Sequence, residues 1–148
     1  MMSQAVVRQE WRLLDDLFRR DLLQSLLVFL AGALGLLACY HLLALVDSKY
    51  IDRILPFWQF VGLLCFVFLY HVNGSLSAQL RSFRREPLAW VSVVGSLIII
   101  TGSVIEARNG SIGGVVLVML ATQACFIFPL SFLLWRRYNR LWRNEVVL

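Results

Sequence analysis

Four long stretches without a single charged side chain determine what this chain can fold into. They cover residues 22–46, 54–80, 87–105 and 109–135. A helix needs about 20 apolar residues to cross a hydrocarbon core about 30 Å thick, so each stretch can hold one such helix. Hydrophobic residues make up 59% of the chain and charged residues only 16%, unlike soluble globular domains. The sequence therefore predicts an all-α integral membrane protein, a four-transmembrane-helix bundle with short loops.

Prolines and Asn-Gly-Ser runs predict where these helices begin and end. Pro56 and Pro87 lie at the expected starts of the second and third helices, where the amide that proline lacks would be unpaired anyway. The Asn-Gly-Ser runs predict the end of the second helix and the turn before the fourth. Pro129 predicts a kink inside the fourth helix, because it frees the carbonyl of Cys125. One membrane domain, residues 1–148, is expected to hold spans at about 22–46, 54–73, 87–106 and 112–135.

Arginine and lysine are distributed unevenly among the connections. Basic residues in short loops are retained on the cytoplasmic side of a membrane. Eleven of the 14 precede the first span, join the second to the third or follow the fourth, and three lie in the other two connections. We therefore expect a multi-pass protein with both termini cytoplasmic, in a bacterial inner (plasma) membrane. The eleven are Arg8, Arg12, Arg19, Arg20, Arg81, Arg84, Arg85, Arg136, Arg137, Arg140 and Arg143; the three are Lys49, Arg53 and Arg108.

Two charged segments flank the spans. Over residues 4–20, apolar and charged side chains follow helical spacing on separate faces, which predicts an amphipathic helix lying in the membrane interface. A docking site for a cytosolic partner is the alternative. Aromatic and basic residues alternate in the extension at 136–148, which predicts anchoring to anionic lipids on the cytoplasmic face. The net charge of +5 fits such lipids better than a nucleic acid. The expected lipid contacts are Arg136, Arg137, Arg140 and Arg143.

The residues that usually indicate catalysis or metal binding are missing from the sequence. Cys39, Cys65 and Cys125 are isolated in apolar segments, so we interpret them as small reduced core residues. The sequence contains no phosphate-binding loop, no nucleophile elbow and no metal-spaced cluster of histidine or cysteine. We therefore expect no enzymatic activity, no metal and no cofactor of its own.

Three side chains are candidates for a polar site. His41 and His71 could ligate haem, but they are expected near opposite ends of their helices, roughly a bilayer's thickness apart. One of them as a ligand shared with another subunit remains open. Glu106 lies at the outer end of the third span with Arg108 as a local counter-charge, and a solvated loop carboxylate is the alternative interpretation.

Small and polar residues line one face of the third span. Lipid tails provide no hydrophobic drive for helices to associate, so close approach through small residues must do so. The first span offers a matching stripe, which predicts that these two spans pack together within the chain. The alternative is that this face meets a partner subunit or lines a polar path. The third-span face holds Ser92, Gly95, Ser96, Ile99, Gly102, Ser103 and Glu106; the first-span stripe holds Ser25, Gly32, Gly35 and Cys39.

These features favour a non-catalytic structural, assembly or accessory subunit of a larger membrane complex, whose partners are other membrane subunits or further copies of the chain. A small oligomeric transporter and a membrane-anchor or cytochrome-type subunit of a redox enzyme are the alternatives. Residues 132–137, Phe-Leu-Leu-Trp-Arg-Arg, resemble the aromatic and basic helix end of the small four-span proteins proposed to move polyprenyl-linked sugars. The segment lacks the asparagine expected before the arginines. The resemblance implies a flippase-like form of the transporter.

Overall fold

The computed structural model is all-helical and describes residues 10–46, 55–81 and 86–145. In this part of the chain, four helical segments are long and apolar enough to cross a membrane, as the charge-free stretches predict. The fourth segment is continuous, with a π-helical turn between two α-helices. The elements are α2 (Trp11–Leu45), α3 (Phe57–Arg81), α4 (Ala89–Arg108), α5 (Ile112–Thr122), η2 (Gln123–Ile127) and α6 (Phe128–Glu145).

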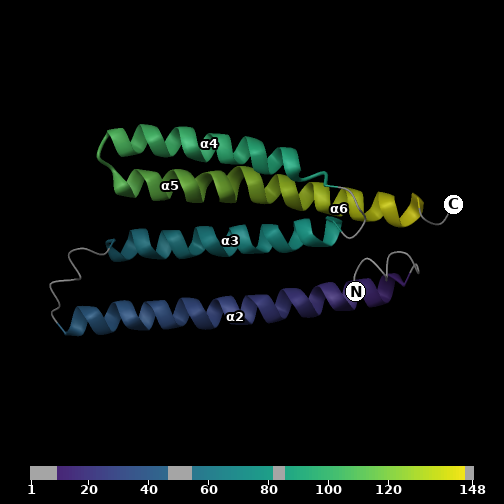
Figure 1. The fold of residues 1–148 in the computed structure, drawn as a ribbon, viewed down its shortest axis with the longest axis horizontal. Coiled ribbons are helices and arrows are strands. Elements are labelled where there is room, and N and C mark those ends of the chain that lie inside the picture. The colour runs from purple at the N-terminus through teal and green to yellow at the C-terminus, as the bar shows by residue number, and fades with distance from the viewer. Residues whose placement is uncertain (1–9, 47–54, 82–85, 146–148) are drawn as a thin grey trace.

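The four segments lie side by side and alternate in direction (Figure 1). α2 contacts α3, while α3 also contacts α5, η2 and α6, and α4 contacts α5 and η2. α2 and α4 therefore lie on opposite sides of the molecule, separated by α3 and the last segment. The prediction that the first and third spans pack together is wrong, because the last span occupies the small-residue face of α4.

α2 is a single helix of 35 residues. At 1.5 Å per residue it is about 52 Å long, well beyond the roughly 30 Å of a hydrocarbon core. Its charged side chains all fall between Arg12 and Asp21, so this end extends beyond the apolar part. The predicted separate interfacial helix is wrong for residues 11–20, because no glycine or proline before Gly32 interrupts the helix. Residues 4–9 lie outside the described residues.

The two Asn-Gly-Ser runs behave differently. At 109–111 the predicted turn is confirmed. Gly110 has a φ of +71°, and the Ser111 hydroxyl accepts a hydrogen bond from the amide of Gly114 at 2.9 Å. At 73–75 the predicted helix end is wrong, because α3 continues to Arg81. Here the serine hydroxyls donate hydrogen bonds to carbonyls of the same helix. Ser75 donates to the carbonyl of His71 at 3.2 Å, and Ser77 donates to the carbonyl of Asn73 at 3.0 Å.

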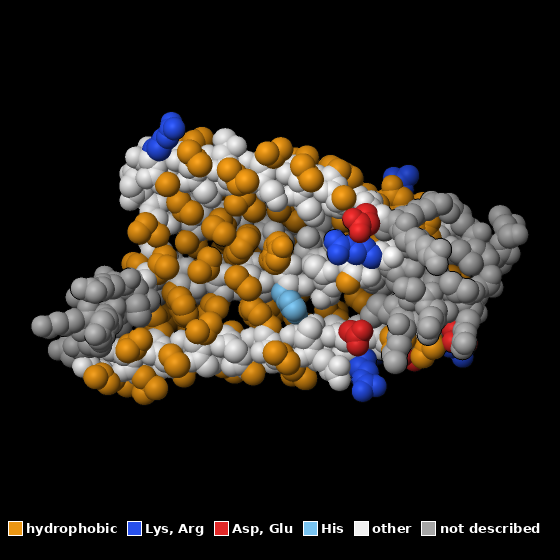
Figure 2. All heavy atoms as spheres, viewed as in Figure 1, with side chains coloured by type: hydrophobic (Ala, Val, Ile, Leu, Met, Phe, Trp, Pro, Cys, Tyr) orange, Lys and Arg blue, Asp and Glu red, His pale blue; other side chains and the backbone are white. Residues whose placement is uncertain are grey.

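Charge is confined to the ends of the bundle. On the face shown in Figure 2, arginine and acidic side chains lie towards the ends, and hydrophobic side chains cover the surface between them. Leu27, Val28 and Leu34 are among the large apolar side chains exposed on α2. A soluble protein rarely exposes a continuous apolar surface of this extent. The structure is that of a multi-pass membrane protein.

Candidate functional site

The last span is distorted immediately before Pro129. The amide of Phe128 donates to the carbonyl of Gln123, five residues back, which closes the π-helical turn η2. Proline displaces the carbonyl four residues before it, so a wider turn accommodates the ring. The structure thus shows a π turn directly before Pro129, and the predicted kink of the helix stays a prediction. Such turns occur frequently at functional sites.

A groove of about 260 Å³ lies between α3 and α4, with η2 as its floor. α3 contributes Tyr70 and Asn73, α4 contributes Ser92 and Ser96, and η2 contributes Gln123. Asn73 is 6% exposed and Gln123 is 1% exposed. The Oδ1 atom of Asn73 and the Nε2 atom of Gln123 are buried without a hydrogen-bond partner among the described residues. Both residues line the same groove, although these two amide atoms are themselves buried.

Asn73 and Gln123 are functional candidates that the sequence analysis missed. The available signal was an amide side chain in each of two charge-free stretches, and polar residues inside a span are commonly functional. Asn73 lies eight residues before Arg81, which places it about 12 Å along the helix from that charge. The groove therefore lies inside the apolar band, in the half nearer to the end of α3.

Gly95 and Gly102 hold α4 against the last span. A Cβ atom on Gly95 would overlap the side chain of Ile127, and one on Gly102 would lie 2.6 Å from Cγ1 of Val118. Both sites are thus filled by side chains of the same chain. Ser103 has its hydroxyl oxygen buried next to this contact with no partner in the described part.

Gly32 and Gly35 are in the opposite situation. Both are exposed, and no atom lies within 4 Å of the position that a Cβ would take. α2 meets α3 along a different face through rings such as Phe29 and Phe68, whose centroids are 5.6 Å apart. The structure therefore leaves these glycines on an open surface.

Cys39, Cys65 and Cys125 are all exposed on the outside of the bundle. The interpretation as core residues is wrong. In a membrane protein the lipid-facing surface is as apolar as the interior, so an apolar side chain does not by itself indicate burial.

The two histidines lie at different depths. His41 contacts Phe57 at the start of α3, with ring centroids 5.5 Å apart, while His71 stacks on Phe29 at 6.1 Å. Phe57 and His71 are 14 residues apart along α3, which corresponds to about 21 Å. The two imidazoles of one chain therefore cannot ligate one iron. A ligand shared with another subunit stays a prediction.

Glu106 lies against the start of α5. A Cβ atom on Gly114 would overlap its carboxylate, and the Ser111 cap lies beside the same glycine. No ion pair joins Glu106 to Arg108 among the described residues, and the role of Arg108 as a local counter-charge stays a prediction. The free amides at a helix N-terminus favour a carboxylate there.

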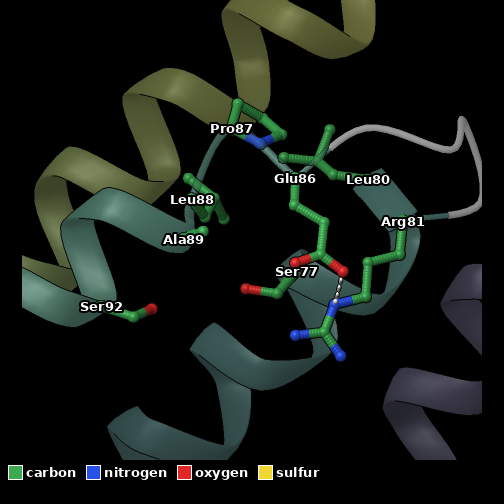
Figure 3. Close-up of a pocket in the computed structure, with 8 residues that line it drawn as sticks. All are labelled: Ser77, Leu80, Arg81, Glu86, Pro87, Leu88, Ala89 and Ser92. Atoms are coloured by element: carbon green, nitrogen blue, oxygen red, sulfur yellow. Dashed lines mark ion pairs between the residues drawn. The ribbon is translucent and has the colours of Figure 1, made fainter.

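The end of the bundle where α3 meets α4 is closed by packing. Leu80, Leu88 and Trp142 form a buried cluster, and the indole N–H of Trp135 donates to Oε1 of Gln79 at 2.6 Å. Figure 3 shows the ion pair that crosses this junction, between Arg81 Nε and Glu86 Oε1 at 3.2 Å. Both partners are exposed, so the apolar cluster stabilises the junction more than the ion pair does.

The C-terminal arginines lie on the outer face of α6. Arg136, Arg137 and Arg140 are exposed and line an open groove with Leu133 and Leu141. The Arg136 guanidinium lies 5.8 Å from the ring centroid of Phe132. The side chain of Arg143 lies outside the described residues. Contact with anionic lipid stays a prediction for all four arginines.

Comparison with known proteins gives no match: no protein-family model, no curated protein and no solved structure matches the chain. The function must therefore be argued from the residues and their geometry. Two features stand out, the open glycine face of α2 and the polar groove at η2.

Proposed function

We propose that the chain is a non-catalytic subunit of a larger membrane assembly and that α2 packs against a helix of a neighbouring subunit. The observation that carries this proposal is the difference between two pairs of glycines. Gly95 and Gly102 of α4 are filled by side chains of the same chain, whereas Gly32 and Gly35 of α2 meet no atom within 4 Å. Small residues let membrane helices approach closely. An unfilled pair supports a contact made between chains.

The sparse packing of α2 supports the same proposal. Leu14 is its buried residue, and the apolar part of the helix contacts α3 along one side. Since lipid gives no hydrophobic drive for association, a helix held by so few contacts gains stability from a further close neighbour. That neighbour is a helix of another subunit or α2 of a second copy.

We expect Gly32→Leu combined with Gly35→Leu to abolish assembly without destabilising the chain. Two leucines would keep a neighbouring helix from approaching closely, while their Cβ atoms would meet no atom of the chain within 4 Å. The measurement is the protein mass of the purified particle in mild detergent. The wild type should exceed the 17.0 kDa of one chain, and the variant should match it.

Ala44→Leu is the matched control, because Ala44 is also small and exposed but lies on the side of α2 opposite to Gly32 and Gly35. It should assemble like the wild type. A double variant that keeps the wild-type mass, or a wild type of one chain, would contradict the proposed role. A complex of two identical chains and one with different subunits are separated by identifying the proteins in the particle.

We infer that the end of the bundle holding α6 and the N-terminus of α2 is cytoplasmic. Its excess of arginine motivates this orientation. Reporters fused after residue 148 or inserted within 82–85 should read cytoplasmic, and one inserted at Gly110 should read external. An external reading at the C-terminus would reverse the orientation. In this orientation Arg136, Arg137 and Arg140 face the anionic headgroups of the inner leaflet.

The groove at η2 favours a small transporter as the second candidate function. It places polar side chains inside the apolar band, which is where transporters hold their substrates. Assembly and transport are compatible, because the groove lies between α3 and α4 and the open glycines lie on α2.

A further inference from the structure

We propose that the arginine face of α6 binds the head of a membrane lipid that carries a phosphate monoester. This face holds Arg136, Arg137 and Arg140, which line one open groove together with Leu133 and Leu141. The proposal rests on the contact with anionic lipid proposed above and names the class of lipid, whereas the assembly role of α2 is independent of it. It is carried by the unbalanced charge of the groove, by the arrangement of the arginines and by their depth in the membrane.

The charge of this face is not balanced by the protein. Arg136, Arg137 and Arg140 are exposed, and among the described residues no acidic side chain lines the groove and no ion pair includes any of the three. The charged end of α2 differs, since residues 11–21 hold three arginines and three aspartates. Like charges on adjacent turns of a helix repel one another, and a bound anion removes that repulsion. The face therefore favours an anion from outside the protein.

The three arginines form a compact triangle on the helix surface. Arg140 lies three residues after Arg137 and four after Arg136, which places its Cβ atom about 5–6 Å from each of theirs. Long side chains that start this close together can reach one phosphate, and a guanidinium can donate two hydrogen bonds to its oxygens. A phosphate monoester offers three free oxygens and up to about two negative charges at neutral pH, whereas a phosphodiester offers two oxygens and about one charge. The monoester therefore matches the triangle better.

Contacts of Trp135 place the arginine face at the depth of the lipid head groups. The Trp135 indole donates to Gln79, two residues before Arg81, and its ring centroid lies 6.2 Å from that of Phe18, three residues before Asp21. Arg81 and Asp21 border the charge-free stretches of α3 and α2. Trp135 thus marks, to within one helical turn, the depth at which charge begins on all three helices. The arginine face starts at the next residue.

The membrane side of the groove indicates a lipid and not a free phosphate. Leu133 lies about one turn before the arginines and is exposed in the charge-free part of the last span. Side chains of a helix lean towards its N-terminus, which in α6 is the direction of the apolar part. Arg136 does so, because its guanidinium lies 5.8 Å from the ring centroid of Phe132, four residues earlier. A lipid whose phosphate is held here has its chains beside Leu133.

The test uses dioleoyl phosphatidic acid as the probe, with the full-length protein in phosphatidylcholine nanodiscs. Native mass spectrometry measures how much of the probe stays bound to the ejected protein. Dioleoyl phosphatidylglycerol is the matched lipid, because it has the same chains and a phosphodiester head. We expect phosphatidic acid to bind about tenfold more tightly, as one further charge-assisted hydrogen bond implies.

Lowering the pH from about 7.5 to about 5 should remove most of this preference. The second ionisation of a phosphate monoester has a pKa of about 6, so phosphatidic acid loses its second charge while the arginines keep theirs. Binding of phosphatidylglycerol should not change over this range. An equal amount of inorganic phosphate should not displace the lipid, because it has no chain to lie beside Leu133.

Arg140→Gln locates the site. It removes one corner of the triangle and should weaken binding of phosphatidic acid about tenfold. Arg12→Gln is the matched control, since Arg12 is also exposed and lies in the charged end of α2, outside the groove. It removes the same charge from the protein and should bind the lipid like the wild type.

The proposal is overturned if the two lipids bind equally at about pH 7.5, if the preference is unchanged at about pH 5, or if inorganic phosphate displaces the lipid. It is also overturned if Arg140→Gln binds as the wild type does, or if Arg12→Gln weakens binding equally, since the attraction would then come from net charge alone. In each case the general contact with anionic lipid still holds if phosphatidylglycerol is retained better than phosphatidylcholine. Equal retention of those two lipids would contradict that contact as well.

Discussion

Replacing Gly95 with leucine is expected to destabilise the protein in detergent by about 3 kcal/mol. Even a Cβ atom at this position would overlap Ile127, and Ile127 is only 5% exposed, so its side chain has little space into which to move. α4 would have to move away from η2, which would disturb its packing against the last span. Unfolding in a graded series of denaturing detergent measures the loss.

A double-mutant cycle with Ile127→Ala makes this prediction specific. Removing the Ile127 side chain beyond Cβ creates space, so Gly95→Ala should be far less harmful in the Ile127→Ala background than in the wild type. Gly32→Leu is the control, because a Cβ atom at this position meets no atom of the chain within 4 Å. Equal effects of leucine at positions 95 and 32 would contradict the packing described for α4.

Trp142→Ala is expected to cost about 3–5 kcal/mol, the usual effect of removing a buried aromatic side chain. Trp142 is 5% exposed and completes the cluster with Leu80 and Leu88 where α3 ends and α4 begins. Its loss should open this end of the bundle and loosen the last turns of α6. Thermal unfolding followed by circular dichroism measures the change.

Trp58→Ala provides the comparison, since Trp58 is 80% exposed and lies at the opposite end of the bundle. It removes the same side chain from a surface position, so its melting temperature should stay within a few degrees of the wild type. If both tryptophan variants melt alike, Trp142 anchors the chain in the membrane interface and does not close the bundle.

The spans themselves were predictable because one physical requirement decides them. A charged side chain inside the hydrocarbon core is costly, so the charge-free stretches mark the helices directly. Pro56 and Gly110 fixed boundaries for similarly local reasons. The end of α3 was not predictable, since Asn73 and Ser75 suit a turn as well as a helix whose hydroxyls bond to its own carbonyls.

The pairing of the helices and the polar groove depend on information that spacing alone does not contain. Gly95 permits close approach by any helix, and the Ile127 side chain that fills it belongs to a π turn. Asn73 and Gln123 are 50 positions apart and follow no shared pattern, and only the placement of α3 beside η2 brings them to one groove. Pro129 was the local feature of the sequence that indicated an irregular turn in this part of the last span.

The continuity of α2 makes it a mechanical lever. About ten residues, 11–20, extend the apolar part of the same helix by about 15 Å, and in this extension Leu14 is buried and Phe18 contacts Trp135 of α6. Because no glycine or proline acts as a joint between the two parts, a tilt imposed at the Gly32 and Gly35 face swings the charged end by the same angle. Force applied to that end is likewise transmitted as torque to the face within the membrane. The helix thus couples contacts with neighbouring helices inside the bilayer to movement of its charged end at the membrane surface.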